Sequence, residues 1–449
     1  MSKNTYLKTY KTADLAKKNL LCRKRISLVD YKLPKEQQAK NKELFKKNLS
    51  PYQLVSKIIS DVIKNGDLSV KEYCNILDGS TLDSLIVSEN EFEEAFTKVN
   101  QTDVDAIKFM ATRIRNYHEI QLQHAEREFF QNGFGIKVVA INTVGIYMTG
   151  SLTSLPSSII HTAMPASVAG VNNIYGITPT DKAGKVNPYK LIAARFAGIE
   201  KVYKASGAQA IASFAFGTES IPQVDKIAGP GNIFVAMAKQ QVNGAVGVDG
   251  LYGPTETLII ADEHADPEIC TADILHAAEH DALAIPILIT DSKDLASSVS
   301  KLIQEKLETF DRSDVIESSL KNGGIVITED IDEAIILSNM FGPEHLCIST
   351  KNAESLIPKI QNAGGIFVGE GTPEVIGDYT GGISHVMPTG GAAKFSSPLS
   401  IYDFQKIISI ANIQELDLAK LGPYASQIAK IEGLDAHANS IDVRLEKLK

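Results

Sequence analysis

Alternation of strand-like and helix-like segments is the feature that most constrains this chain. From about residue 136 to residue 368, short runs rich in β-branched residues alternate with longer helical patterns. Alternation of this length is typical of parallel sheets that helices cover on both faces. A first series ends near residue 254 and a second begins near residue 255. The sequence therefore predicts two doubly wound α/β domains of similar plan, with a weak internal duplication as one explanation.

Helical patterns flank the two series. Residues 51–132 read as helices, beginning with Ser50 as N-cap and Pro51 in the first turn. Residues from about 399 also read as helical, including "SIYDFQKIISI". We expect four parts: a basic helical N-terminal arm (1–50), a first domain (51–135 and 255–398), a second domain (136–254) and a C-terminal helical segment (399–449).

Charge is distributed unevenly along the chain. Residues 1–50 hold 14 Lys and Arg against 4 Asp and Glu, while the remainder holds 31 against 50. A basic arm can indicate nucleic-acid or lipid contact, but this one has no aromatic stacking pattern. We expect the arm to lie on the acidic body or on an acidic partner subunit, and we expect no nucleic-acid partner.

Apolar runs and cysteines indicate the compartment. No apolar run approaches the ~18–20 residues of a membrane span, and the N-terminus lacks the apolar core of a secretory signal. Four scattered cysteines form no C-x-x-C pair, which argues against a disulfide framework or a thiolate zinc site. We therefore expect a cytoplasmic protein with no membrane association.

Glycine-rich turns follow two predicted strands. "ASGAQA" (205–210) and "AGPGN" (228–232) each lie between a strand and a helix, where backbone N–H groups can hold a phosphate. Neither matches the dinucleotide fingerprint, and neither has the acidic partner expected about 20 residues on. Tight strand–helix turns use glycine for purely structural reasons too, so both interpretations stay open. A third glycine-rich patch (380–397) is expected to form an active-site loop.

The stretch "HAAEH" (276–280) places His276 and His280 on one face of a helix, close enough to share a metal ion. It also matches an inverted zinc-protease signature, but the doubly wound context argues against a peptidase. Other candidates lie near predicted loops: Glu344, His345, Asp378, His385, Glu432 and His437. Any one of these histidines can be structural. Together they favour a site, because zinc accepts His and Asp, and adjacent Glu and His suit general-base chemistry.

Long strings of the sequence identify a family. In chain order they are "VGIYMTG", "LPSSIIHTAMPASVAGV", "SGAQAIASFAFGTESIPQVDKIAGPGN", "GPTETLIIAD", "AEHDA", "FGPEHL", "IGDYTGGISHVMPTGGAAKFSSPLSIYDFQK" and "EGLDAHANSIDVRL". From about residue 50 onward the chain resembles the histidinol dehydrogenase family. The resemblance implies an NAD-dependent, zinc-containing homodimer of histidine biosynthesis that oxidises L-histidinol to L-histidine through a bound aldehyde, in two hydride transfers.

The resemblance also implies two Rossmann-like domains without the glycine fingerprint, the first carrying catalytic and zinc residues and the second the NAD contacts. Glu344 would activate water and His345 would be the general base. The implied NAD contacts are Tyr147, Gln209 and Asn232, and the implied zinc ligands are His280, Asp378 and His437. The implied substrate contacts are Thr255, His280, His345, Asp378, His385, Glu432 and His437. The segment 399–449 would dimerise and reach into the partner's site.

Several residues depart from the family pattern. The family's Gln ligand three residues before His280 is Ala277, which has no donor atom. We hypothesise that His276 replaces it, although an ideal helix turns His276 about 100° away from that position. The alternatives are water as a ligand, or a weakened or empty zinc site.

Other departures lie in functional loops: Thr255 replaces a Ser, and Thr149 and Ser151 alter the 148–154 loop. A family member that oxidises a different small polar alcohol is therefore the alternative function. A catalytically impaired binding partner is a third interpretation, which the retained Glu344 and His345 oppose.

Overall fold

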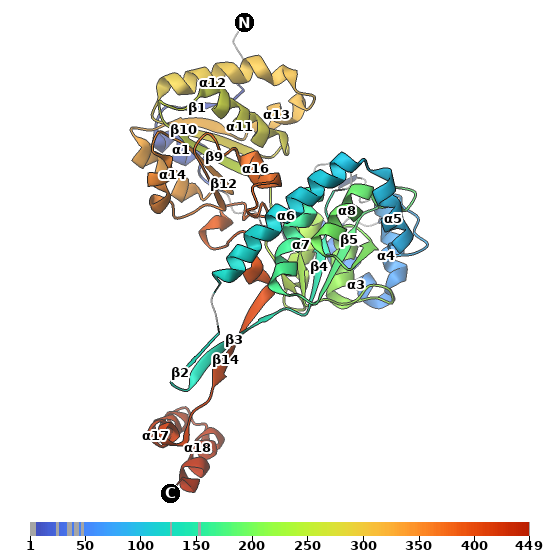
Figure 1. Ribbon diagram of the computed structural model, residues 1–449, viewed down its shortest axis with the longest axis vertical. Helices are drawn as coiled ribbons and strands as arrows, with labels where there is room; N and C mark the ends of the chain where they lie inside the picture. The colour runs from blue at the N-terminus through green and yellow to red at the C-terminus, as the bar shows by residue number, and fades with distance from the viewer. Residues whose placement is uncertain are drawn as a thin grey trace. The chain divides into compact units, whose positions relative to one another are not determined.

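The computed structural model describes residues 6–23, 27–33, 38–39, 45, 49–125, 128–150 and 154–448. The chain forms two compact units (Figure 1). Unit 1 contains Met1–Gln123 and Ile141–Phe404, and unit 2 contains His124–Ala140 and Gln405–Lys449. The departure predicted at Ser151 and parts of the N-terminal arm lie outside the described residues.

A six-stranded parallel sheet in unit 1 carries the second of the two predicted series. Its strand order is β1-β11-β10-β9-β12-β13. The strands are β1 (Thr9–Tyr10), β9 (Glu256–Ala261), β10 (Ile285–Thr290), β11 (Gly324–Ile327), β12 (His345–Ser349) and β13 (Gly365–Val368). Every residue of β9 and β12 is buried, as expected for central strands of a sheet covered on both faces.

Helices cover both faces of this sheet and form two apolar cores with it. The bounds are α11 (Pro267–Glu279), α12 (Lys293–Lys306) and α13 (Ser313–Leu320) for one face, and α1 (Ala13–Asn19) and α14 (Ile331–Phe341) for the other. Shorter elements are α15 (Ala353–Leu356) and α16 (Glu374–Tyr379), with 3₁₀ turns η2 (Leu307–Thr309), η3 (Ile357–Lys359) and η4 (Ala392–Lys394).

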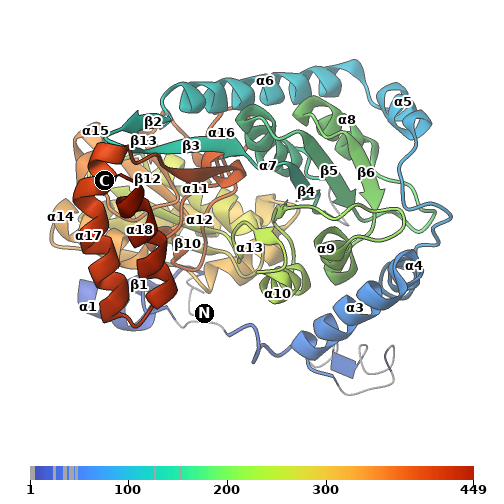
Figure 2. The same cartoon turned by 90° about the horizontal axis from the view of Figure 1, so that it is seen from below.

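A five-stranded parallel sheet carries most of the first predicted series. Its strand order is β6-β5-β4-β7-β8. The strands are β4 (Thr143–Tyr147), β5 (Asn173–Thr178), β6 (Lys201–Lys204), β7 (Lys226–Ala228) and β8 (Gly247–Val248). Figure 2 shows two helices on one face, α7 (Pro156–Ala169) and α8 (Pro188–Ala197), and two on the other, α9 (Gly207–Phe216) and α10 (Ile233–Val242).

Both sheets have the same strand order. Counted within each series, the order is third, second, first, fourth, fifth, with β1 added at the edge of the larger sheet. This order is that of a doubly wound, Rossmann-like sheet. The predicted fold class is thus confirmed, and the common order agrees with two domains of similar plan.

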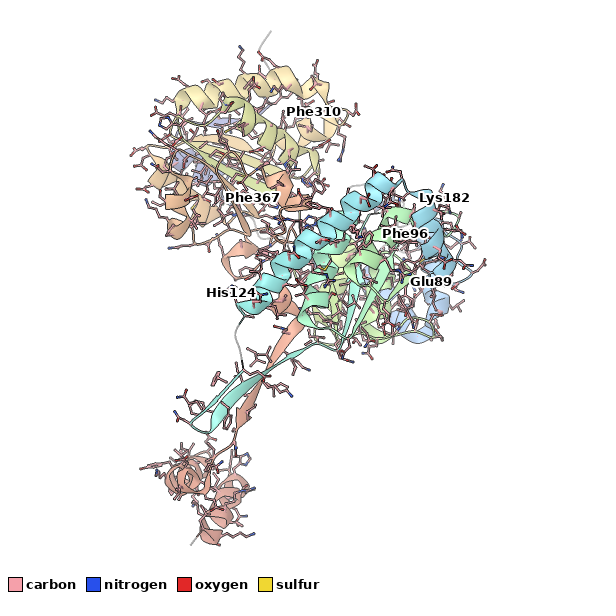
Figure 3. All side chains as sticks on the ribbon, viewed as in Figure 1. Glu89, Phe96, His124, Lys182, Phe310 and Phe367 are labelled. Atoms are coloured by element: carbon pink, nitrogen blue, oxygen red, sulfur yellow. The ribbon has the colours of Figure 1, made fainter. Side chains whose placement is uncertain are left out.

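The helices between residues 51 and 123 pack on the smaller sheet's domain. They are α3 (Pro51–Asn65), α4 (Asp67–Tyr73), the π-helix η1 (Cys74–Asp78), α5 (Glu89–Lys98) and α6 (Gln101–Gln123). Helix α5 contacts α8 through the edge-to-face rings of Phe96 and Phe196 and the ion pair of Glu89 with Arg195 (Figure 3). This grouping differs from the predicted division, which placed 51–135 with the other domain. Residues of α3, α4 and η1 belong to the apolar core of the smaller sheet's domain, while α5 packs on α8 and α6 packs on α7 and α8.

Residues 6–23 of the N-terminal arm lie on the larger sheet, whereas Leu28, Tyr31, Phe45 and Leu49 pack against the core of the smaller sheet's domain. Within residues 6–23, the arm forms the helix α1 and the strand β1, which pairs with β11. The Arg23 guanidinium donates to both carboxylate oxygens of Glu256, with Nη2 2.6 Å from Oε2, and stacks on the Phe341 ring. These contacts agree with a basic arm that binds the acidic body.

Unit 2 corrects two predictions. It contains β2 (Phe129–Gln131), β3 (Phe134–Ala140), β14 (Gln405–Ala411), α17 (Glu415–Ile431) and α18 (Asp435–Lys447). The stretch at 400–410, predicted helical, is the 3₁₀ turn η5 (Ile401–Phe404) followed by β14. Strand β3, predicted for a parallel sheet, pairs antiparallel with β14. Its partner lies far away in sequence, so local patterning does not reveal the pairing.

Hydropathy of the helices bears on membrane insertion. Across the residues that the structure describes, no helix combines the length and apolar character needed to cross a membrane.

Candidate functional site

The predicted site residues of unit 1 lie at one edge of each parallel sheet. At the amino edge of the larger sheet, β9 and β12 are neighbours, and Thr257 is in register with His345. Thr255 directly precedes β9, and Glu344 directly precedes β12. Helix α11 ends at this edge, where His280 is its C-cap residue. A helix C-terminus carries partial negative charge, so this edge favours cations.

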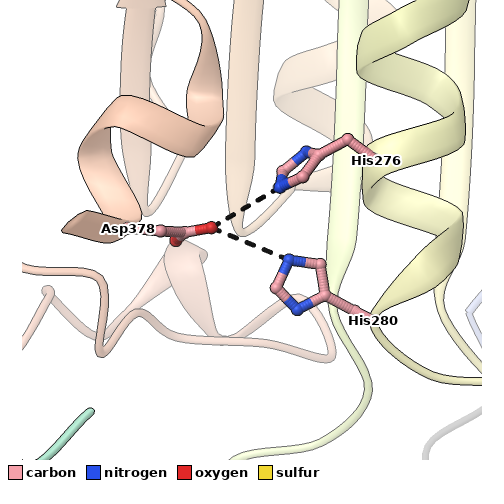
Figure 4. A group of neighbouring side chains, drawn as sticks. All are labelled: His276, His280 and Asp378. Atoms are coloured by element: carbon pink, nitrogen blue, oxygen red, sulfur yellow. Dashed lines mark ion pairs between the residues drawn. The ribbon is translucent and has the colours of Figure 1, made fainter. Parts of the chain in front are cut away.

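Three side chains at this edge lie close enough together to bind one metal ion (Figure 4). The Nε2 atoms of His276 and His280 lie 3.6 and 3.7 Å from Oδ2 of Asp378, which is on α16. One donor atom from each residue lies within 4.8 Å of the others. Burial opposes ionisation of Asp378, but hydrogen bonds from the two histidines hold its pKa well below the ordinary value. Nitrogen and carboxylate donors in this arrangement fit Zn²⁺.

Ala277 takes no part in the cluster. Its side chain is buried at 1% exposure, whereas His276 reaches Asp378 together with His280. On an ideal helix His276 is rotated about 100° from position 277. Its side chain is nevertheless long enough for the imidazole to reach the Asp378 carboxylate that His280 also contacts. This geometry favours the hypothesis that His276 replaces the missing Gln, which stays a prediction.

His385 lies against the same carboxylate. Its Nδ1 is 3.1 Å from the backbone oxygen of Asp378 and 3.7 Å from Oδ1. The His385 ring stacks on that of His161, with centroids 4.1 Å apart and planes 19° apart. Burial holds the pKa of His161 well below its ordinary value, and neither ring nitrogen has a hydrogen-bond partner among the described residues. Sequence reasoning missed His161, because a lone histidine in the apolar pattern of α7 gives no signal.

Glu344 and His345 are both deeply buried. Burial lowers the pKa of His345 to about 3, so its ring is neutral and can accept a proton. Burial raises the pKa of Glu344 well above its ordinary value, and Oε2 of Glu344 accepts a hydrogen bond from the Glu256 backbone N–H at 3.1 Å. The Oε2 atom lies 3.7 Å from Nδ1 of His345. The arrangement offers a neutral base beside a carboxyl group.

Glu374 is a further residue that sequence reasoning missed. Its side chain is fully buried, and Oε1 lies 3.2 Å from Nδ1 of His345. Oε1 also accepts a hydrogen bond from the Thr257 hydroxyl at 3.0 Å, and Oε2 accepts from the Cys347 thiol at 3.8 Å. The carboxyl group thus lies beside Nδ1 of His345, which makes no hydrogen bond among the described residues. The available signal was its position one helical turn before Asp378 on α16.

The smaller sheet carries its site at the opposite edge. A cavity of about 480 Å³ opens at the carboxyl ends of its strands, where the strand order reverses between β4 and β7. Doubly wound sheets bind dinucleotides at such a switch point. The lining residues are Leu54, Ile58, Leu77, Asp78, Tyr147, Thr149, Gly150, Pro179, Ser206, Gly207, Ala208, Asn232 and Phe234.

Two of the three predicted cofactor contacts line this cavity. The Tyr147 hydroxyl accepts a hydrogen bond from the Gly207 N–H at 3.1 Å. Asn232 is the N-cap of α10, and its side-chain oxygen accepts from the Phe234 N–H at 3.0 Å. The third, Gln209, is fully buried and does not line the cavity, and its amide donates to the Ser206 hydroxyl at 3.2 Å.

The "AGPGN" turn has a structural reason for glycine. Gly229 has φ +120°, and a Cβ there would lie 2.5 Å from the Tyr147 carbonyl oxygen. The buried ammonium of Lys239 donates to the Gly229 carbonyl and pairs with Asp249, whose Oδ2 accepts from the Gly229 N–H at 2.7 Å. The turn therefore needs glycine for close packing of β7 on β4, and the same turn borders the cavity.

Glu432 and His437 belong to unit 2. Glu432 is the C-cap residue of α17, and His437 lies in the first turn of α18. Both side chains are exposed at the connection between the two helices.

Comparisons with known proteins agree with the geometry. The family model described as histidinol dehydrogenase matches residues 41–445. Histidinol dehydrogenase of Dehalococcoides mccartyi (strain CBDB1) is 44% identical over 401 residues, covering 89% of this chain and 92% of the relative. That of Bacillus subtilis (strain 168) is 43% identical over 397 residues, covering 88% and 93%. The crystal structure of histidinol dehydrogenase from Elizabethkingia anophelis matches with TM-score 0.89 and 31% identity, covering 99% of each chain.

Proposed function

The chain belongs to the histidinol dehydrogenase family, and we propose that it oxidises L-histidinol to L-histidine with NAD as the hydride acceptor. Family membership makes it an oxidoreductase and supports histidinol oxidation. The observation that carries the proposal is the site at the amino edge of the larger sheet. There a buried neutral imidazole, a buried carboxyl group and a cluster of two histidines and an aspartate lie together.

His345 is the proposed general base. Its ring is neutral because burial disfavours the imidazolium, and its Nε2 makes no hydrogen bond among the described residues. It takes the hydroxyl proton as the first hydride leaves the alcohol carbon, which gives the bound aldehyde. The Glu374 carboxyl group, 3.2 Å from Nδ1, is the nearest group that could orient the ring by accepting a hydrogen bond from Nδ1 during the reaction.

Glu344 is the proposed activator of water for the second half of the reaction. Water adds to the aldehyde carbon, and loss of a second hydride from the hydrate gives the carboxylate. Burial raises the pKa of Glu344, which makes its carboxylate a stronger base toward water than an exposed carboxylate. Tyr147 and Asn232 would hold NAD in the cavity of the smaller sheet, and NAD bound there would accept each hydride.

Zinc fits the cluster of His276, His280 and Asp378. These residues would hold the ion together with His437. When bound, zinc supplies a Lewis acid that orients the substrate and polarises its oxygen. We propose Thr255 and His385 as further substrate contacts, because they lie at the same edge of the sheet.

We propose a homodimer in which Glu432 and His437 of each protomer complete the site of the other. Unit 2 exposes large apolar side chains on β2, β3, β14, α17 and α18, as an interface requires. They include Phe129, Phe130, Phe134, Ile407, Ile408, Leu416, Tyr424, Ile428 and Ile431. We also propose a reducing, cytoplasmic location, because all four cysteines are free thiols.

The test is NADH formation by the purified full-length protein with NAD, L-histidinol and added zinc. Two NADH formed per histidinol would support the proposal. A folded protein that binds NAD and zinc but leaves histidinol unchanged would overturn the substrate assignment. Small amino alcohols would then be assayed for the alternative dehydrogenase activity.

A further inference from the structure

A carboxylate that the sequence patterns did not single out lines the cavity of the smaller sheet. Asp78 is the last residue of η1 and lies in the cavity wall with Tyr147 and Gly207. The Ser206 hydroxyl donates to its Oδ2 at 2.5 Å. Its Oδ1 has no hydrogen-bond partner among the residues that the structure describes. Asp78 thus presents one satisfied and one free acceptor oxygen at the cavity.

The position of Asp78 in the fold is informative. In a doubly wound dinucleotide domain, a carboxylate at the carboxyl end of the second strand accepts hydrogen bonds from the ribose hydroxyls. The second strand here is β5, which ends at Thr178. The hydroxyls of Ser80 and Thr180 lie 2.7 Å apart, so the turn after η1 is fixed to the segment that follows β5. Asp181 of the strand–helix series follows β5 but does not line the cavity, so the carboxylate in the cavity wall is that of Asp78 from η1.

Charge around the cavity favours one form of the dinucleotide. Asp78 is the only Asp or Glu among the lining residues described, and none of them is Lys or Arg. The nearby ammonium of Lys190 is not part of the wall, and it donates to the Gly150 carbonyl and to the Thr178 hydroxyl at 2.9 Å. A 2′-phosphate would bring a charge of about −1.5 to −2 against a carboxylate with no lining cation to offset it.

We propose that Asp78 is the cofactor-specificity residue: its carboxylate binds the adenosine-ribose hydroxyls of NAD and rejects the 2′-phosphate of NADP. The proposal rests on the proposed function in one respect, the use of this cavity for a dinucleotide. Burial raises the pKa of Asp78, and such a poorly hydrated carboxylate gains strongly from two hydroxyl donors.

The experiment compares binding of NAD and of NADP to the full-length wild type, D78N and D78E by calorimetry. We expect the wild type to prefer NAD by about 100-fold or more, as is usual when a charge is used to exclude a competitor. D78N keeps an oxygen for Ser206 but loses the charge. Its NADP-to-NAD preference should shift by about 10-fold or more toward NADP. D78E, which keeps a carboxylate, should retain most of the wild-type preference.

Asp181 offers a matched control, since it is an exposed carboxylate just after β5 that does not line the cavity. D181N removes the same charge and should leave the ratio within two-fold of wild type. An unchanged ratio in D78N, or a wild type that binds both dinucleotides equally, would overturn the proposal. Binding requires no histidinol, so a failure of the proposed substrate is seen separately, in the turnover assay.

Discussion

The two parallel sheets of unit 1 share one strand order but use opposite edges. The smaller sheet has its cavity at the carboxyl ends of the strands, beside Tyr147 and Asn232. The larger sheet has its histidines and carboxylates at the amino ends, around His345 and Asp378. A doubly wound sheet ordinarily binds ligands at the carboxyl edge. The cavity of the smaller sheet lies at the edge that this rule favours, whereas the histidine and carboxylate cluster of the larger sheet lies at the opposite edge.

Helix direction gives a physical reason for the difference. At the carboxyl edge the N-termini of α9 and α10 point their N–H groups at the cavity, which suits anionic phosphates. At the amino edge the C-termini of α11 and α14 carry partial negative charge, which suits a cation such as a metal ion. One fold therefore offers two electrostatically opposite edges. The side chains at each edge then decide which chemistry is carried out there.

The largest expected effect tests the separation of the two edges. H345N removes the proposed base and should lower kcat by about 10²- to 10⁴-fold. The dissociation constant for NAD should stay within two-fold of wild type, because His345 lies at the edge of the other sheet. Steady-state kinetics with histidinol and calorimetry with NAD provide the two measurements. A large loss of NAD affinity would show that the edges do not act independently.

A second prediction concerns the metal at the amino edge. H276A removes one of the three clustered donors and should weaken zinc binding by about 10- to 100-fold or more. The control is H264A, because His264 is an exposed histidine before α11 at the opposite edge of the same sheet. Competition with a chelator measures zinc affinity in both variants. Equal affinity of H276A and wild type would exclude His276 as the replacement for the missing Gln.

A third prediction concerns pH. Burial lowers the pKa of His345 to about 3, so between pH 3 and 6.5 this residue is protonated in the unfolded chain and neutral in the folded protein. The free energy of unfolding should therefore fall as pH falls below 6.5, by about 2 kcal/mol at pH 5 from this group alone. Urea unfolding of chelator-treated wild type and H345Q measures the difference. H345Q should lose that part of the pH dependence, and an identical slope would contradict the buried neutral imidazole.

The smallest expected effect separates two roles of Asn232 at the carboxyl edge. N232A removes the N-cap of α10 and should lower the free energy of unfolding by about 1 kcal/mol, together with NAD affinity. N232D keeps a capping oxygen and should have near-wild-type stability. It should still weaken NAD binding, because it loses an amide donor and adds negative charge near the phosphates. If N232D bound NAD like wild type, Asn232 would be a helix cap only.

The sequence by itself determined the parts that depend on local patterns. The alternation of β-branched runs and helical segments predicted both doubly wound sheets. Helix periodicity placed His276 and His280 on one face, and motif strings indicated the family that the comparisons confirm. Each of these features depends on residues that are close together in the sequence, so the sequence alone can predict it.

Only the tertiary structure decided which distant residues meet. It brought Asp378 of α16 to the α11 histidines, Glu374 to His345, and Asp78 to the end of β5. It also made residues 405–411 a strand, because their partner β3 lies at residues 134–140. Each of these contacts joins segments that are separated by many residues. The packing of whole domains decides which distant strands pair and which distant side chains are buried together. Neither segment carries a periodic sequence pattern that identifies its partner.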